Sequence, residues 1–107
     1  MVAKYLARAS YNAEGVRGLI KDKASGRRAS VAKLAESLGG KLESFYLAFG
    51  SDDVVSIVEL PDNGAAAAFS LAVNAAGLAQ LSMTPLMTAE EMDAGIAKSA
   101  NYRAPGR

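Results

Sequence analysis

Alternating apolar and polar positions open the chain and predict its first strand. In residues 3–10 (AKYLARAS), Tyr5, Ala7 and Ala9 fall on one face, and the intervening residues fall on the other. Residues 41–50 (KLESFYLAFG) alternate in the same way, and residues 54–60 (VVSIVEL) are rich in the β-branched side chains common in strands. With residues 78–87 (LAQLSMTPLM), the pattern predicts four strands.

Segments with helical spacing separate and follow these strands. The predicted helices cover about residues 12–20, 25–38, 63–76 and 89–100, and residues 100–107 are expected to form an irregular tail. Asn12, Asp62 or Asn63, and Thr88 stand where N-capping residues are expected, and Gly77 stands where a helix commonly ends. The interruption KDKASG divides the first two helical segments.

The segment FGSDDVVSIVELPD, residues 49–62, predicts a β-hairpin. Pro61 ends the second strand because it has no backbone N–H to donate. Asp52 and Asp53 are adjacent, and adjacent side chains on an extended chain point to opposite faces. We therefore interpret the acidic pair as turn residues and not as two carboxylates that share a proton or a metal.

The resulting order, β-α-β-β-α-β with a terminal helix, predicts a ferredoxin-like α+β fold. Right-handed crossovers place both main helices on one face of a four-stranded antiparallel sheet and leave the other face bare. The length of 107 residues predicts a single domain, residues 1–107.

Sorting the strand residues by alternation separates two faces. The set expected beneath the helices is Tyr5, Ala7, Ala9, Phe45, Leu47, Phe49, Val55, Ile57, Leu81 and Met83. The set expected on the bare face is Leu6, Arg8, Ser10, Leu42, Ser44, Tyr46, Val54, Ser56, Val58, Gln80, Ser82 and Thr84. This second set is too apolar for a face in water, which predicts that two copies pair sheet to sheet as a homodimer and enclose a barrel, with further assembly left open.

A small organic molecule is the ligand class that such a barrel would suit. The candidate ligand-binding residues are Arg8, Ser10, Ser44, Tyr46, Ser56, Gln80 and Ser82. Arg8 would anchor an acidic molecule. The alternatives are an ion pair with a carboxylate such as Glu43 or Glu59, or a position at the barrel mouth from which the charged end reaches water. Acid–base catalysis with Tyr46 or Ser82 as the bonding hydroxyl stays open. The alternative function is a structural or stress-associated oligomer whose barrel is filled by its own side chains.

Composition removes several classes of chemistry. The chain has no histidine and no cysteine, which excludes a Ser-His-Asp triad, thiolate catalysis and histidine or cysteine metal sites. We expect no metal and no cofactor. A net charge of +1 gives no electrostatic reason to bind nucleic acid or a membrane surface. The first residues contain no secretory signal, so a cytoplasmic location is expected.

Arg27 and Arg28 open the second helical segment, the end at which the helix dipole disfavours cations. Solvation of the two long side chains is one explanation, and a partner carboxylate or an anion is the other.

Four stretches of the chain resemble the GYD domain family. They are KYLARASYNAEGVRGL, GRRASVAKLAESLGGKLESFYLAFG, ELPDNGAAAAFSLAVNAAG and LMTAEEMDAGIAKSANYRAPG, and together they extend over about residues 2–106. The resemblance implies a ferredoxin-like subunit of the dimeric α/β-barrel group. That group includes cofactor-free monooxygenases, haem-handling proteins, dehydratases and lactone isomerases, so the resemblance assigns no reaction.

The element that names the family is altered in this sequence. A Gly-Tyr-Asp motif is expected in the hairpin, and residues 50–53 read Gly-Ser-Asp-Asp. Gly50 and Asp53 match the first and last positions, whereas Ser51 or Asp52 stands in place of the tyrosine. A role that depends on that phenolic hydroxyl is not carried over to this chain.

Overall fold

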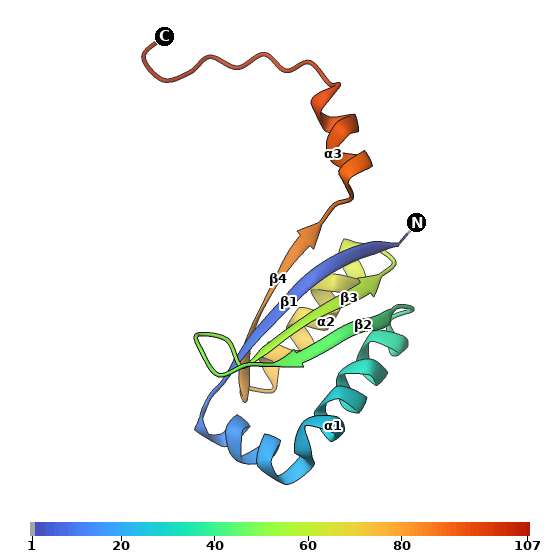
Figure 1. Cartoon of the computed structure of the whole chain (residues 1–107), viewed down its shortest axis with the longest axis vertical. Coiled ribbons are helices and arrows are strands. Elements are labelled where there is room, and N and C mark those ends of the chain that lie inside the picture. The colour runs from blue at the N-terminus through green and yellow to red at the C-terminus, as the bar shows by residue number, and fades with distance from the viewer. Residues whose placement is uncertain (1) are drawn as a thin grey trace.

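The computed structural model describes residues 2–107 and contains one antiparallel sheet flanked by helices (Figure 1). The elements are β1 (Ala3–Tyr11), α1 (Ala13–Ser37), β2 (Lys41–Leu47), β3 (Val54–Leu60), α2 (Asn63–Ala75), β4 (Ala79–Leu86) and α3 (Ala89–Ile96). The strands lie in the order β2-β3-β1-β4, and every neighbouring pair is antiparallel. The predicted element order and the ferredoxin-like α+β fold are confirmed.

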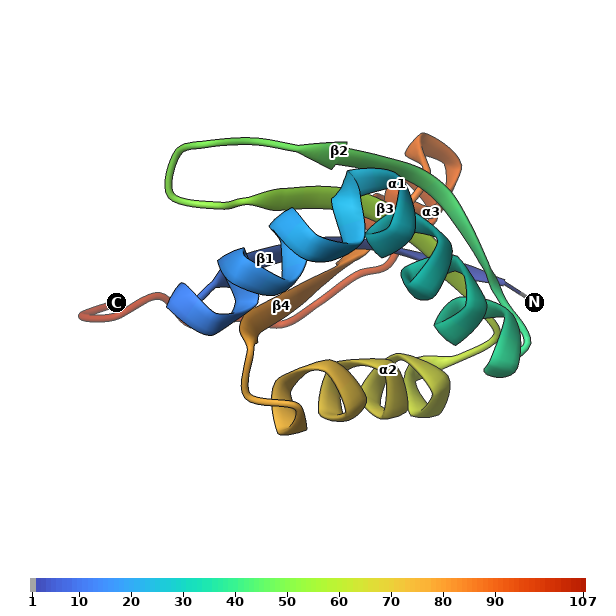
Figure 2. The same ribbon diagram turned by 90° about the horizontal axis from the view of Figure 1, so that it is seen from below.

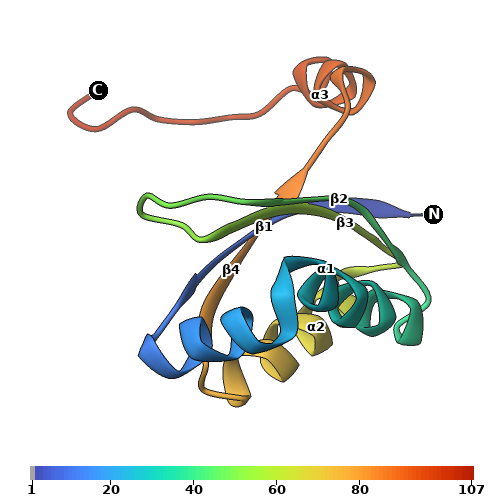
Figure 3. The ribbon, with the colours of Figure 1, turned by 60° about the horizontal axis from the view of Figure 1, so that its bottom comes forward.

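Two helices cover one face of the sheet, and α3 lies on the other side. Figure 3 shows α1 and α2 together beneath the sheet, with α3 and the residues after it above. α1 packs mainly against β2, and α2 packs mainly against β4 (Figure 2). In the described part of a single chain, the helices therefore cover only one face of the sheet.

The caps begin the helices where the sequence predicts. The Asn12 side chain accepts a hydrogen bond from the backbone N–H of Gly15 at 2.9 Å, and the Asp62 side chain accepts one from Ala65 at 2.9 Å. At α3, Thr88 and Glu91 satisfy each other's backbone N–H groups in a capping box.

The interruption predicted near residues 21–26 takes the form of a kink inside one helix. Lys23 has φ 67° and ψ 159°, a non-helical conformation between two helical halves of α1. The bend in the first helix is visible in Figure 1. The prediction of two helical segments is therefore correct in position, although the segments are joined at a single residue.

The core lies between the sheet and the two covering helices. Its largest fully buried side chains are those of Val58, Leu60 and Phe69. Tyr5 and Ala7 of β1 and Ala35 of α1 complete its centre. The core therefore joins β1 and β3, the two central strands, to both helices.

The predicted facing of β3 is wrong. Val54, Ser56, Val58 and Leu60 are buried beneath the helices, and Val55 and Ile57 lie on the bare face. The register shows this directly, since Ala7 pairs with Ser56 and Tyr5 pairs with Val58. Alternation alone did not separate the two faces, because each set contains apolar residues and one polar residue, Ser56 in one and Glu59 in the other.

Two further residues of the first hairpin differ from their predicted faces. Leu42 lies on the helix side, because a β-bulge between Leu42 and Ser44 shifts the register of β2 by one residue. Alternation predicts Phe49 beneath the helices, but its side chain is fully exposed, because β2 ends at Leu47 and Phe49 belongs to the hairpin loop. The remaining predicted helix-side residues lie on that side as expected.

Candidate functional site

The face of the sheet without helices is the candidate site, and we call it the uncovered sheet face. It consists of Lys4, Leu6, Arg8, Ser10, Ser44, Tyr46, Val55, Ile57, Glu59, Gln80, Ser82 and Thr84. Leu6, Val55 and Ile57 are half-buried at its centre. An apolar centre bordered by polar side chains is typical of a surface that contacts a partner or a ligand.

The strand register brings four of the uncovered residues into one row. Tyr46 pairs with Val55, Val55 with Arg8, and Arg8 with Ser82, so the row crosses all four strands. Neighbouring strands are separated by about 4.8 Å, so roughly 10 Å separates the backbones of Tyr46 and Arg8. A ligand that contacted both would therefore have to span two strand spacings or be enclosed by a second surface.

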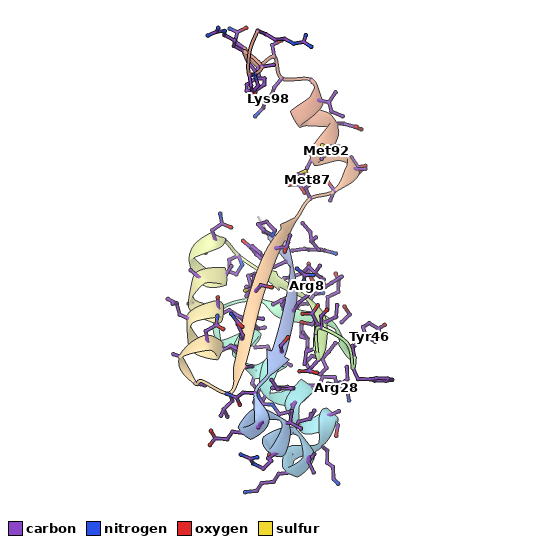
Figure 4. The ribbon with its side chains drawn as sticks, turned by 90° about the vertical axis from the view of Figure 1, so that its left-hand side faces the viewer. Arg8, Arg28, Tyr46, Met87, Met92 and Lys98 are labelled. Carbon is purple, nitrogen blue, oxygen red and sulfur yellow. The ribbon has the colours of Figure 1, made fainter. Side chains whose placement is uncertain are left out.

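Flanking rows hold the other predicted polar residues. Ser44 pairs with Ile57 in the row on one side, and Ser10 pairs with Gln80 on the other side of Arg8. Figure 4 shows Arg8 on β1 and Tyr46 on the outer strand β2. Tyr46 is 69% exposed, so its phenol projects into solvent in the single chain.

Arg8 has a carboxylate partner, but not one of the two expected from the sequence. Its Nη1 lies 3.9 Å from Oδ2 of Asp52 in the hairpin loop. Glu43 instead pairs with Lys4 at 2.5 Å, and Glu59 pairs with Lys41 at 3.2 Å. The hydrogen bond and charge of Glu43 raise the pKa of Lys4 above its usual value.

The Arg8–Asp52 pair is long and partly exposed, which leaves the guanidinium with donors for another group. Nearly half of the Arg8 side chain is accessible to solvent. An exposed pair at this distance contributes little to stability. Arg8 therefore lies near Asp52 and still has N–H groups that can donate to another acceptor.

Ser56 does not lie with the other candidate residues. Its side chain is on the helix side, is 3% exposed, and donates a hydrogen bond to the carbonyl oxygen of Ala7 at 3.3 Å. The misassigned face of β3 accounts for this error. Ser56 is therefore not part of the uncovered sheet face.

Asp53 has a structural role in the hairpin, as the turn interpretation requires. Its Oδ2 accepts the backbone N–H of Tyr11 at 2.8 Å. Its own N–H donates to Ala9 O, and its carbonyl accepts from Ala48, both at 2.8 Å. Asp52 therefore pairs with the side chain of Arg8, whereas Asp53 forms hydrogen bonds with the backbone of β1.

Asp53→Ala should destabilise the protein more than Asp52→Ala. The first change leaves the partly buried N–H of Tyr11 without its acceptor, which costs about 1–2 kcal/mol. The second removes an exposed ion pair worth about 0.5 kcal/mol or less. Urea unfolding of both variants measures the difference, and equal losses would contradict the assigned role of Asp53.

A cavity lies on the opposite side of the sheet, between α1, α2 and the strands. Its volume is about 290 Å³, and its walls include Leu19, Val31, Phe45, Phe69 and Leu81. Sequence analysis did not predict it. The available signal was the concentration of glycine and alanine on the elements that surround it.

Two features are absent from the described residues. Among residues 2–107, no group of three or more acidic side chains is arranged to hold a metal ion. Within the same range, none of the helices is both long enough and apolar enough to cross a bilayer.

The fold and site together define a class: a ferredoxin-like α+β subunit with helices on one sheet face and a mixed apolar and polar surface on the other. Comparison with family models identifies the family within this class, since the model described as GYD domain matches residues 5–96. The chain belongs to the GYD domain family. Searches of curated proteins and of solved structures find no match.

Proposed function

We propose that two copies of this chain pair through the uncovered sheet face and bind a small acidic organic molecule between them. The observation that carries the proposal is the composition of that face. Leu6, Val55 and Ile57 form an apolar centre beside Arg8, and within residues 2–107 no helix covers it. A two-fold pairing would remove this apolar area from water and bring two copies of Arg8 into one enclosed space.

The C-terminal arm, residues 87–107, supports pairing. Every residue of α3 is exposed, and Met92 and Ile96, four positions apart, share one side of the helix. Met87 is also exposed at the start of the arm (Figure 4). The arm lies on the same side of the sheet as the uncovered face, so a second copy packed there is the surface within its reach (Figure 3).

The proposed ligand class follows from Arg8 and its neighbours. A guanidinium binds a carboxylate or phosphate through paired N–H donors, and its interaction strengthens as water is excluded. Ser82 lies beside Arg8 in the register, and Gln80 and Ser10 lie in the next row. These neutral groups would orient the remaining polar atoms of a bound molecule, while Leu6 and Val55 would contact its apolar part.

Native mass spectrometry of gently purified protein tests the proposal, because it reports subunit number and bound mass together. We expect a dimer, or a multiple of it, that carries additional non-protein mass. Arg8→Ala should keep the dimer and lose that mass. Lys4→Ala is the matched control, because Lys4 is a second ion-paired cation on the same face but stands away from the Arg8 row.

The outcomes separate the two functions considered. A dimer without added mass in any variant would favour the structural oligomer with a filled barrel. A monomer would contradict the proposed pairing altogether. Loss of the added mass in both Arg8→Ala and Lys4→Ala would show that general positive charge, and not Arg8, holds the ligand.

A further inference from the structure

The walls of the cavity beneath α1 combine small residues with larger apolar side chains. Small residues on three elements face it, namely Ala7, Ala9, Gly15, Gly18, Ala72 and Ala76. The larger apolar side chains of Phe69, Val31 and Leu81 surround the remaining space. Small side chains therefore leave space on the strand side and on the helix side of the cavity.

The first helix, α1, is attached to the rest of the fold near both of its ends. At one end, Asn12 donates hydrogen bonds from its backbone N–H to Leu78 O at 3.0 Å and from Nδ2 to Gly77 O at 2.6 Å. At the other end, Ala35 is completely buried in the core. Between these two attachments, Lys23 adopts its positive φ and α1 bends.

The backbone conformation of Lys23 is unfavourable in free energy, so the contacts around it must stabilise it. A non-glycine residue in this region of φ and ψ is strained by about 1–3 kcal/mol, and such strain is concentrated at functional sites. The kink lies between the cavity-lining residues Asp22 and Arg27. The strained residue thus lies next to the cavity wall, one position after Asp22.

Two groups of polar side chains, Ser56 and the pair Asp22 and Arg27, line the mainly apolar cavity. Ser56 lies in the wall with its hydroxyl buried, and that hydroxyl keeps lone pairs able to accept a hydrogen bond after donating to Ala7. Asp22 and Arg27 also line the cavity, and their Oδ2 and Nη1 atoms are 3.4 Å apart. Arg27 is one of the two cations that the helix dipole disfavours, and this position gives it an anion to bind.

We propose that this cavity is a second binding site, for an apolar acid whose hydrocarbon body fills the space beneath the kink and whose carboxylate binds Arg27. An apolar cavity of about 150 Å³ holds one benzene ring. The present cavity of about 290 Å³ is nearly twice that size, which fits a two-ring aromatic acid. The site lies across the sheet from Arg8, so it is independent of the function proposed above.

Naphthalene-2-carboxylate is the probe, with its binding measured by isothermal titration calorimetry. Gly18→Leu fills the cavity, since a Cβ at Gly18 meets no atom within 4 Å. We expect at least a tenfold loss of affinity and a melting temperature no lower than that of the unmodified protein, because leucine favours the helix more than glycine does. Gly95→Leu makes the same change in α3, also in open space, and should leave the affinity unchanged.

Arg27→Gln tests the carboxylate contact. It should weaken naphthalene-2-carboxylate about tenfold while leaving the neutral analogue 2-naphthol unchanged. The proposal is overturned if the probe does not bind the unmodified protein, if Gly18→Leu binds it as well as that protein does, or if Arg8→Ala removes binding. A change of subunit number in Gly18→Leu would also overturn it, because another copy would then be the occupant.

Discussion

We expect Ile57→Glu to separate the proposed dimer into monomers. Ile57 lies at the centre of the uncovered sheet face, between Leu6 and Ser44 in the register. The cations in the neighbouring rows, Arg8 and Lys4, already have carboxylate partners in Asp52 and Glu43. A further carboxylate buried there costs about 3 kcal/mol, and a two-fold interface contains the change twice. The combined cost of about 6 kcal/mol weakens association by about four orders of magnitude.

Sedimentation equilibrium measures this dissociation, and Ile20→Glu provides its control. Ile20 is 67% exposed on α1, on the covered side of the sheet, so the same substitution there should leave the dimer intact. A dimer that persists in Ile57→Glu would mean that the copies do not meet through the uncovered sheet face. The helix-side core does not contain Ile57, so folding of the monomer is expected to survive.

The second large effect concerns the contact between α1 and the start of β4. We expect Gly15→Ala to lower the free energy of unfolding by about 3 kcal/mol, at the upper end of overpacking costs. A Cβ at Gly15 would lie 2.1 Å from Leu78 O and 2.9 Å from Cδ1 of Tyr11. Backbone atoms cannot yield as a flexible side chain does, so α1 must move away from β4.

Gly18→Ala is the matched control for Gly15→Ala, three residues further along the same helix. Its added methyl meets nothing within 4 Å, and alanine favours a helix over glycine by about 1 kcal/mol. Chemical denaturation of the two variants should therefore give shifts of opposite sign. Two stabilising shifts would show that the close approach at Gly15 is not required.

Much of the fold could be predicted because its local signals agree. The caps at Asn12, Asp62 and Thr88 each accept the hydrogen bond expected of them. Pro61 follows the last residue of β3, where a missing N–H does no harm to the ladder. These signals depend on neighbours in sequence, which is why sequence reasoning recognised them.

The sheet face was wrongly predicted for residues of β2 and β3, where the local sequence does not distinguish the two faces. In β3, Val54 and Val55 are equally suited to either face, and only the pairing of β3 with β1 decides between them. In β2, the bulge near Glu43 adds one residue and reverses the alternation on one side of it. Neither feature can be derived from a period of two, because both depend on the partner strand.

The sequence predicts most residues of the candidate site correctly, and the structure differs at a few positions. Arg8, Tyr46 and Ser82 lie in one row as the alternation suggests, but Ser56 lies on the other face. The partner of Arg8 comes from the hairpin loop, whose conformation follows from the contacts of Asp53 with β1. The cavity beneath α1 is lined by residues of both helices and all four strands, so its place could not be located from sequence spacing.

The exposed position of α3 has a consequence for the lifetime of the protein. A helix of eight residues is too short to be stable in water by itself. In the proposed dimer its order would come from the second copy, so the fraction of folded arms would rise with protein concentration. An unpaired chain would carry an unfolded end, which is where proteases cut first. Copies that had not found a partner would then be removed faster than paired ones, and turnover would adjust the amount of protein to what can assemble.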